Sequence, residues 1–285
     1  MIINHNISAL NTYRQLSFNA ANGAKSLEKL SSGYRINRAG DDAAGLAISE
    51  KMRGQIRGLN QAQRNGQDGI SLIQTAEGAL TETHAILQRM RELVVQAGNG
   101  TNATEDVTAI QDEIGALIEE IDGIGDRTQF NGKTLLDGTY TAASGGEAIT
   151  LQIGANTGQT LTLNIESMKA ADLGATGLAM SSIDVTAFAT SGTSFDEQLA
   201  SIDKAIEQVS SQRSALGALQ NRLEHTINNL GAASENLTAA ESRIRDVDMA
   251  QEMMEFTKNN ILTQAAQSML AQAIQVPQSV LQLLR

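Results

Sequence analysis

The sequence contains no cysteine, no tryptophan and only one proline among its 285 residues. Without cysteine, the chain can form no disulfide bond and has no thiolate for catalysis or metal binding. Aromatic residues make up 3% of the chain, whereas large globular cores draw much of their buried area from aromatic side chains. With Pro277 as its single proline, the chain also lacks the commonest helix breaker. These absences favour long helices joined by narrow seams of alanine and aliphatic residues.

Long apolar runs and positive charge are also scarce. No segment has the run of about eighteen consecutive apolar residues that a membrane-spanning helix needs. The formal net charge of −11 argues against nucleic acid or an anionic membrane as a partner. The N-terminal stretch MIINHNISALNTYRQLSF has neither a basic region nor a continuous apolar core. We therefore expect no cleaved secretory signal peptide.

Two series of apolar residues recur every seven positions. The first is Ile202, Val209, Leu216, Leu223, Leu230, Leu237 and Ile244. The second, which is interrupted by a glycine at position 66, is Met52, Leu59, Ile73, Leu80, Leu87 and Val94. A strict seven-residue repeat is typical of helices that supercoil around a partner along an apolar seam. We interpret these two series as the assembly seams of long paired helices.

The helix boundaries follow from capping and breaking signals. We predict helices over 45–97 and 195–245, and a shorter amphipathic helix over 103–125. Ser194 and Glu197 have the spacing of a capping box at the start of the 195–245 helix. The fold class is therefore mainly α: an elongated antiparallel helical bundle or coiled coil.

Residues 138–194 differ in composition, being rich in threonine, serine and glycine. The segments AITLQI and QTLTLNI alternate apolar and polar residues, and GANTG between them supplies residues suited to a turn. This pattern predicts a small β-hairpin. We expect the segment to form a loop-and-strand cap at the hairpin end of the bundle.

The two chain ends carry almost no charge. Residues 1–24 contain one formal charge, on Arg14, and residues 259–284 contain none. Both ends keep apolar residues at helical spacing, but their other faces are asparagine, glutamine, serine, threonine and alanine. A solvated helix usually displays charged side chains, so we infer that these helices are marginal alone and become ordered by packing with other subunits.

The stretch LSSGYRINRAGDDAAGLAISEKM, residues 30–52, lies between two helical patterns. It gathers Gly33, Arg35, Arg38, Asp41 and Asp42. The two aspartates could bind a cation or act as an acid–base pair, but no third ligand is evident nearby. We favour a joint in which one aspartate caps the helix that follows and the glycine lets the chain turn. The two arginines would pair with the aspartates or with a neighbouring subunit.

No other motif indicates chemistry. The histidines His5, His84 and His225 lack metal-ligand spacing, and HExxH is absent. The glycines form neither a phosphate-binding loop nor a dinucleotide fingerprint, and there is no GxSxG. We therefore predict no catalytic residue, no cofactor and no metal site.

Several long motifs resemble bacterial flagellin. Besides residues 30–52, they are NGQDGISLIQTAEGAL, LQRMRELVVQAGNGT, TQFNGKTLL, SRIRDVDMAQEM and QVPQSVLQLLR. The resemblance covers roughly 1–140 and 195–285, and implies a short flagellin with a minimal variable outer region. It implies an inner domain of paired terminal helices, residues 1–42 and 246–285. It also implies an outer rod, residues 43–137 and 195–245, that carries the 138–194 cap. Residues 30–42 would be the spoke between these layers.

The resemblance also implies a function. It implies a structural subunit, not an enzyme, that polymerises into the extracellular flagellar filament for motility. A hook–filament junction protein of the same superfamily is the alternative, and a soluble enzyme on a helical scaffold is a third hypothesis from another class.

The partners follow from the same resemblance. They are further copies of the chain, the flagellar export apparatus, a cytoplasmic export chaperone, and the filament cap and junction proteins. The implied localisation is extracellular, without a cleaved signal peptide. Matching motifs also imply recognition by host innate immune receptors, through Arg89, Leu93 and Glu113 for a cell-surface receptor and Leu281, Leu283 and Leu284 for cytosolic receptors.

Overall fold

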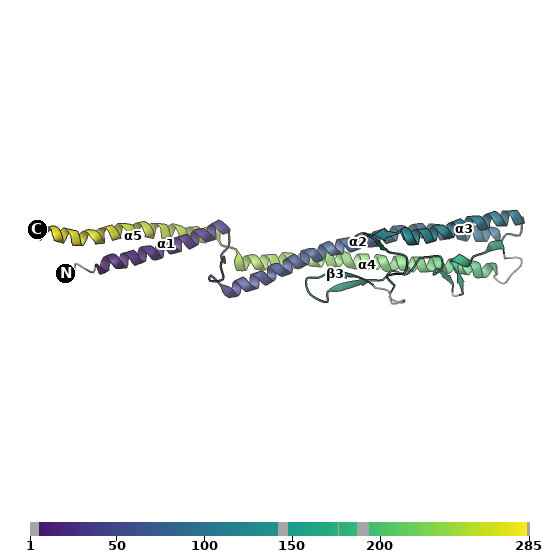
Figure 1. Cartoon of the computed structure of the whole chain (residues 1–285), viewed down its shortest axis with the longest axis horizontal. Helices are drawn as coiled ribbons and strands as arrows, with labels where there is room; N and C mark the ends of the chain where they lie inside the picture. The colour runs from purple at the N-terminus through teal and green to yellow at the C-terminus, as the bar shows by residue number, and fades with distance from the viewer. Residues whose placement is uncertain (1–5, 142–147, 176, 187–193, 284–285) are drawn as a thin grey trace. The chain divides into compact units, whose positions relative to one another are not determined.

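A computed structural model describes residues 6–141, 148–175, 177–186 and 194–283. The described chain is mainly α-helical, as the sequence predicts (Figure 1). Its five α-helices are α1 (Ile7–Ser32), α2 (Ala43–Ala97), α3 (Thr104–Arg127), α4 (Phe195–Arg245) and α5 (Met249–Leu283). None of the helices in these residues is long and apolar enough to cross a membrane.

The chain divides into two compact units, each made of segments that are close in space. The terminal unit comprises residues 1–56 and 235–285, and the central unit comprises residues 57–234. The helices α2 and α4 contribute to both units. The inner and outer domains expected from the sequence, with boundaries at 42/43 and 245/246, stay a prediction.

The central unit is built from α2, α3 and α4 around one apolar core. The heptad residues of both long helices lie in this core with no exposed surface: Ile73, Leu80, Leu87, Val94, Ile202, Val209, Leu216 and Leu223. The helix α3 adds Ile110, Ile114 and Ile121 from one face. Burial of a leucine or isoleucine side chain contributes about 1.5–3 kcal/mol, so the apolar repeat accounts for the pairing of these helices.

The start of α4 is capped as the sequence predicts, and the glycine in the α2 repeat lies at a close contact with α4. The Ser194 backbone N–H donates to the Glu197 carboxylate at 3.0 Å, and the Glu197 N–H donates to the Ser194 hydroxyl oxygen at 3.3 Å. At Gly66, a Cβ atom would lie 3.0 Å from the Ile227 side chain. The absence of a side chain at position 66 therefore lets α4 approach α2 closely.

The described strands form two-stranded antiparallel sheets. These are β1 (Gln129–Phe130) with β2 (Lys133–Thr134), β3 (Ile149–Gln152) with β4 (Thr160–Leu163), and β5 (Gly174–Ala175) with β6 (Leu178–Ala179). A short 3₁₀ helix, η2 (Met180–Ser182), follows β6. The β3–β4 pair confirms the predicted hairpin, with Ile149 opposite Leu163 and Leu151 opposite Leu161.

The position of this hairpin differs from the expected cap. It lies along the side of α2, where Asn65 donates its side-chain amide to the Gln152 carbonyl at 3.0 Å. At Gly69, a Cβ atom would lie only 2.6 Å from the Leu151 side chain. Because Gly58 and Gly69 leave room on this face of α2, the hairpin packs against the helix instead of covering its end (Figure 1).

In the terminal unit, α1 and α5 lie side by side, which confirms the predicted pairing of the terminal helices (Figure 1). Polar contacts join them near both ends of α1. The Asn6 side-chain amide donates to the Ala273 carbonyl at 2.8 Å, and Lys29 Nζ lies 3.5 Å from the Glu252 carboxylate. The two helices therefore run antiparallel in a defined register.

Candidate functional site: the joint and the outer face of the terminal helices

The joint between α1 and α2, residues 33–42, begins with a left-handed turn. Gly33 follows the last residue of α1 with φ 75°, and its N–H donates to the Lys29 carbonyl at 2.9 Å. Glycine adopts this conformation without the steric cost that a Cβ atom brings. Gly33 therefore ends α1 and redirects the chain, as the sequence predicts.

The joint then pairs with the short connection between α4 and α5. Tyr34 and Asp246 form an isolated antiparallel bridge. The Arg35 N–H donates to the Arg245 carbonyl at 2.7 Å, and the Val247 N–H donates to the Gly33 carbonyl at 3.1 Å. Backbone hydrogen bonds thus connect two segments about 200 residues apart in the sequence, and they hold the ends of α1, α4 and α5 together.

The two aspartates bind backbone N–H groups. One oxygen of Asp41 accepts hydrogen bonds from the N–H groups of Arg38 at 2.9 Å and Asn37 at 3.2 Å. These two bonds, helped by the nearby lysines 25 and 29, lower the pKa of Asp41 below its usual value. Asp42 accepts from the Gly45 N–H at 2.8 Å, which confirms the predicted cap at the start of α2.

The arginine side chains bind groups other than the aspartates. Arg38 makes a two-pronged contact with the Glu28 carboxylate, at 2.9 and 3.2 Å. The Arg35 guanidinium donates to the Ile244 carbonyl at 2.7 Å. The expected pairing with Asp41 or Asp42 is therefore wrong for both side chains, which bind Glu28 and the Ile244 carbonyl instead. The alternative, pairing with a neighbouring subunit, stays a prediction.

Sequence reasoning missed Arg245, which is central to this joint. Its guanidinium lies over the Tyr34 ring, 4.7 Å from the centroid, and donates to the Glu50 carboxylate at 2.8 Å. The Arg245 side chain is only 13% exposed. Its hydrogen bond lowers the pKa of Glu50. An arginine in the last turn of a helix is the usual signal for interaction with that helix end, so the sequence did not indicate this contact with α2.

None of this geometry resembles a catalytic or metal site. Among the residues that the structure describes, no group of three or more histidine, aspartate or glutamate residues lies close enough to hold a metal ion. The acidic groups of the joint are engaged with backbone N–H groups and arginines. What this arrangement does chemically is to hold three helix ends in fixed relation.

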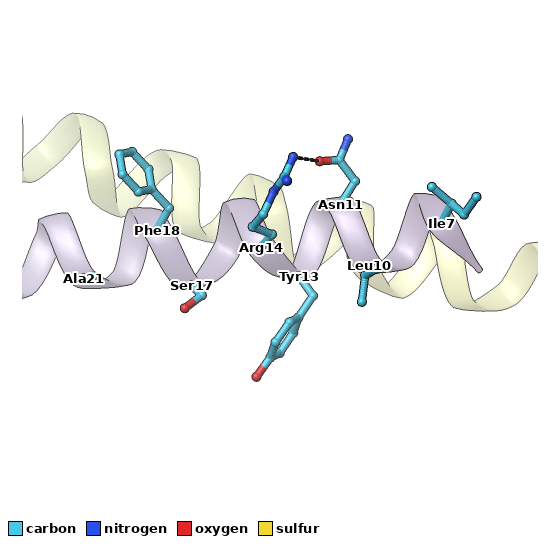
Figure 2. A pocket seen from close by; sticks show the side chains of 8 residues that line it. All are labelled: Ile7, Leu10, Asn11, Tyr13, Arg14, Ser17, Phe18 and Ala21. Atoms are coloured by element: carbon cyan, nitrogen blue, oxygen red, sulfur yellow. Dashed lines mark hydrogen bonds between the residues drawn. The ribbon is translucent and has the colours of Figure 1, made fainter. Parts of the chain in front are cut away.

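The outer face of the terminal helices carries the large apolar side chains. On α1, Ile7, Leu10, Tyr13 and Phe18 are 61–71% exposed, and they line an open hollow of about 850 Å³. In Figure 2, Leu10 and Tyr13 project from one edge of α1 and Phe18 projects from the other. On α5, Met254 and Ile261 are 68% and 61% exposed. An exposed apolar surface of this kind marks a site for another protein surface.

Comparison with known proteins identifies the family. A profile of the bacterial flagellin N-terminal helical region matches residues 3–141, and one of the C-terminal helical region matches residues 199–284. A flagellin of Bacillus subtilis (strain 168) is 65% identical over 304 aligned positions that cover the whole of both chains. The chain belongs to the bacterial flagellin family. A flagellin of Halalkalibacterium halodurans is 59% identical, again over the full length of both chains.

A solved structure adds information on the fold alone. It is described as a "putative flagellar hook-associated protein" from Vibrio parahaemolyticus, and it matches 72% of this chain and all of its own with a TM-score of 0.60. At 17% identity, this likeness shows only that the two chains share a fold. Flagellins are a family of structural proteins.

The predicted seam of this flagellin-family chain is not uniformly buried. The heptad positions from Ile73 to Val94 in α2, and those from Ile202 to Leu223 in α4, have no exposed surface. The next heptad position of α4, Leu230, is 8% exposed. The residues outside these stretches are half-buried: Met52, Leu59, Leu237 and Ile244. The seam therefore serves first as the core of the central unit, and its role in assembly stays a prediction.

The residues predicted for receptor recognition fall into two groups. Arg89 and Glu113 are about half exposed and form an ion pair at 2.9 Å, whereas Leu93 is 2% exposed in the core. The hydrogen bond to Glu113 is the first cause of a raised Arg89 pKa. Leu281 and Leu283 lie in the last turns of α5, but their side chains lie outside the described residues, as does the whole of Leu284.

Proposed function

We propose that this chain is the structural subunit of an extracellular bacterial flagellar filament that drives motility, and that it is not an enzyme. Full-length similarity to proteins named flagellin supports the filament subunit over the hook–filament junction protein. The fold likeness to a hook-associated protein does not alter this preference, because a fold can be shared by proteins with different functions.

One structural observation carries the proposal. The terminal helices expose many of their large apolar side chains, such as Leu10 at 71%, whereas the most deeply buried side chains between them, Ser26 and Asn259, are polar. In a stable monomer the opposite arrangement would be expected. Burial of these exposed faces against further copies of the chain would supply the association energy, since apolar burial is the main driving force of such contacts.

The joint supports the same function mechanically. Rigid backbone pairing between residues 34–35 and residues 245–246 would transmit force between the terminal helices and the long helices α2 and α4. Small shifts at the contacts between copies would then let the filament adopt alternative packings.

The remaining partners belong to this proposal as well. Export as an unfolded chain by the flagellar export apparatus, assisted by a cytoplasmic chaperone, agrees with terminal helices whose exposed apolar faces would be covered only after assembly. Growth beneath a filament cap and on junction proteins follows from the same assembly route. We further propose that host innate immune receptors read Arg89 and Glu113 and the C-terminal leucines. Because Leu93 is buried, it would not contact the cell-surface receptor directly. It would instead pack in the core beneath Arg89 and Glu113 and hold them in position.

The direct test is seeded growth. Purified chain is mixed with short filament fragments at high salt, and the products are imaged by electron microscopy. We expect the fragments to elongate into long tubes, while fragments incubated without added chain keep their length. If the added chain remains monomeric and the seeds do not grow, the filament function is wrong. Short rings in place of tubes would support the junction protein instead.

A further inference from the structure

The seam between α1 and α5 combines small and polar residues with a few large apolar ones. The residues that α1 turns toward α5 are half-buried or buried: Ala9, Thr12, Leu16, Asn19, Gly23 and Ser26. Those of α5 are Phe256, Asn259, Thr263, Ala266, Leu270 and Ala273. The two most deeply buried side chains in this seam are polar, Ser26 at 4% and Asn259 at 7% exposed. Because the large apolar residues of this seam are only half-buried, apolar packing does not explain by itself why the helices align in one register.

We propose that Asn259, seated opposite Gly23, fixes the register of the α1–α5 pair and thereby the alignment of their outer apolar faces. A Cβ atom on Gly23 would lie 3.9 Å from the Asn259 Cβ atom, so the two positions face each other directly. In coiled coils, one buried asparagine selects a register because the alternatives leave its amide against apolar groups. This inference rests on the proposed function, because the faces that it aligns are those that bind further copies.

The sequence of α1 shows why other registers are disfavoured. Positions seven residues apart along the seam carry Ala9, Leu16, Gly23 and Leu30. A slip by one heptad in either direction would therefore place Asn259 opposite Leu16 or Leu30. A leucine side chain fills the space that Gly23 leaves open, and it can accept or donate no hydrogen bond. Of these three registers, only the one with Asn259 opposite Gly23 places no bulky apolar side chain against the Asn259 amide.

The contacts near the ends of α1 are weaker determinants of register. The Lys29–Glu252 pair is partly exposed, with the Lys29 side chain 30% accessible and the charges 3.5 Å apart. Ion pairs in contact with water contribute little. The Asn6 contact lies at the first turn of α1, and helix ends are where hydrogen bonds open most readily.

Register matters because the outer faces of both helices act together. A slip of one heptad would move α5 along α1 by about 10 Å, at about 1.5 Å per residue. The exposed side chains of α1, such as Tyr13, would then meet a different part of α5, and a neighbouring copy would face a surface of altered shape. A register that varied between copies would therefore prevent regular assembly.

The absence of cysteine from the chain makes the register directly measurable. One reporter pair, Ala9→Cys with Ala273→Cys, lies two heptads from the Gly23–Asn259 contact and reports the native register. The other pair, Ala9→Cys with Ala266→Cys, reports the slip that places position 259 opposite Leu16. The pair Gly23→Cys with Asn259→Cys, whose Cβ separation suits a disulfide, calibrates the oxidation. Disulfide-linked peptides of the full-length chain are quantified by mass spectrometry.

The variant is Asn259→Leu, and its matched control is Asn260→Leu on the adjacent, exposed position. Each is combined separately with the two reporter pairs. We expect Asn259→Leu to raise the yield of the slipped disulfide about tenfold, the change that corresponds to the loss of a modest register preference. Asn260→Leu should leave the native disulfide dominant. Gly23→Leu provides a second test, because it fills the space opposite Asn259 and should also promote the slip.

The proposal is overturned if Asn259→Leu and Gly23→Leu both keep the slipped disulfide at the level of the control. Loss of both disulfides in Asn259→Leu would also overturn it, because a residue that only sets register is not required for pairing. Seeded growth of the same variants is scored separately. The two proposals can fail separately. If the reporter variants show the expected disulfide pattern but the unsubstituted chain elongates no seed, the filament function is refuted and the register assignment stands.

Discussion

Single polar side chains determine how the joint is held together. Asp41 and Asp42 each accept hydrogen bonds from backbone N–H groups, and Arg245 contacts both Tyr34 and Glu50. Each of these contacts satisfies a group that would otherwise be left unpaired where the chain changes direction. At this scale, the charged side chains of the joint cap a helix end and connect neighbouring segments, so their role is to hold the chain in its bent path.

The lowered pKa of Asp41 gives the joint a pH dependence with a definite sign. A carboxylate whose pKa is lower in the folded state stabilises that state above its unfolded pKa, and this contribution is lost as the pH falls through the folded pKa. The ordinary value for Asp41 is 3.8, so the loss begins below about pH 4. We expect Asp41→Asn to lower the free energy of unfolding at pH 7 and to have a smaller effect at pH 3.

Denaturant unfolding of the wild type and of Asp41→Asn at both pH values measures this difference. The variant is compared with the wild type at the same pH. Glu50 also has a lowered pKa, but it contributes equally to both chains, so its effect cancels in this comparison. An effect of Asp41→Asn that is as large at pH 3 as at pH 7 would mean that the charge of Asp41 is irrelevant to the joint.

At the scale of the elements, apolar residues at helical spacing are buried in one helix and exposed in another. In α4, the repeat from Ile202 to Leu223 is fully buried in the central core. In α1, by contrast, Leu10 and Phe18 are 71% and 62% exposed. Apolar residues at helical spacing therefore build a core in one helix and leave an exposed face on the other. What decides between them is which elements pack against each helix.

This difference in burial predicts contrasting effects of the same leucine-to-alanine change at two positions. Leu216→Ala removes side-chain atoms that have no exposed surface, so we expect a loss of about 2–5 kcal/mol in the free energy of unfolding. Leu27→Ala, at a position 55% exposed, is the matched control and should change it by less than about 0.5 kcal/mol. Denaturant unfolding followed by circular dichroism measures both. Equal effects would show that the free chain buries Leu27 as deeply as Leu216.

At the scale of the whole molecule, stability of the chain and assembly of the filament depend on different surfaces. Leu10 and Phe18 are 71% and 62% exposed, so their replacement by glutamine removes little burial within the chain. We expect Leu10→Gln with Phe18→Gln to leave the unfolding of the free chain unchanged and to abolish seeded filament growth.

The control for this pair keeps both positions apolar, as Leu10→Met with Phe18→Leu, and should elongate seeds. Electron microscopy of the seeded mixtures gives filament length, and unfolding of the unassembled chain gives stability. Normal growth of the glutamine variant would show that this face of α1 lies outside the contacts between copies.

The sequence by itself determined the helices, their caps and their family. Heptad periodicity places α2 and α4 within two residues of their observed limits, and the Ser194–Glu197 box marks the start of α4 because capping is a local interaction. The alternation in residues 149–163 determined the β-hairpin for the same reason. Long motifs around the joint determined the resemblance to flagellin, which the comparisons confirmed.

Only the tertiary structure decided which residues far apart in the sequence meet. It placed the β3–β4 hairpin along α2, because Gly58 and Gly69 leave room there. It directed Arg35 and Arg38 away from the aspartates, and it brought Arg245 to Glu50. It also set Asn259 against Gly23. Contacts of this kind depend on the three-dimensional path of the chain, and no local periodicity or motif encodes them.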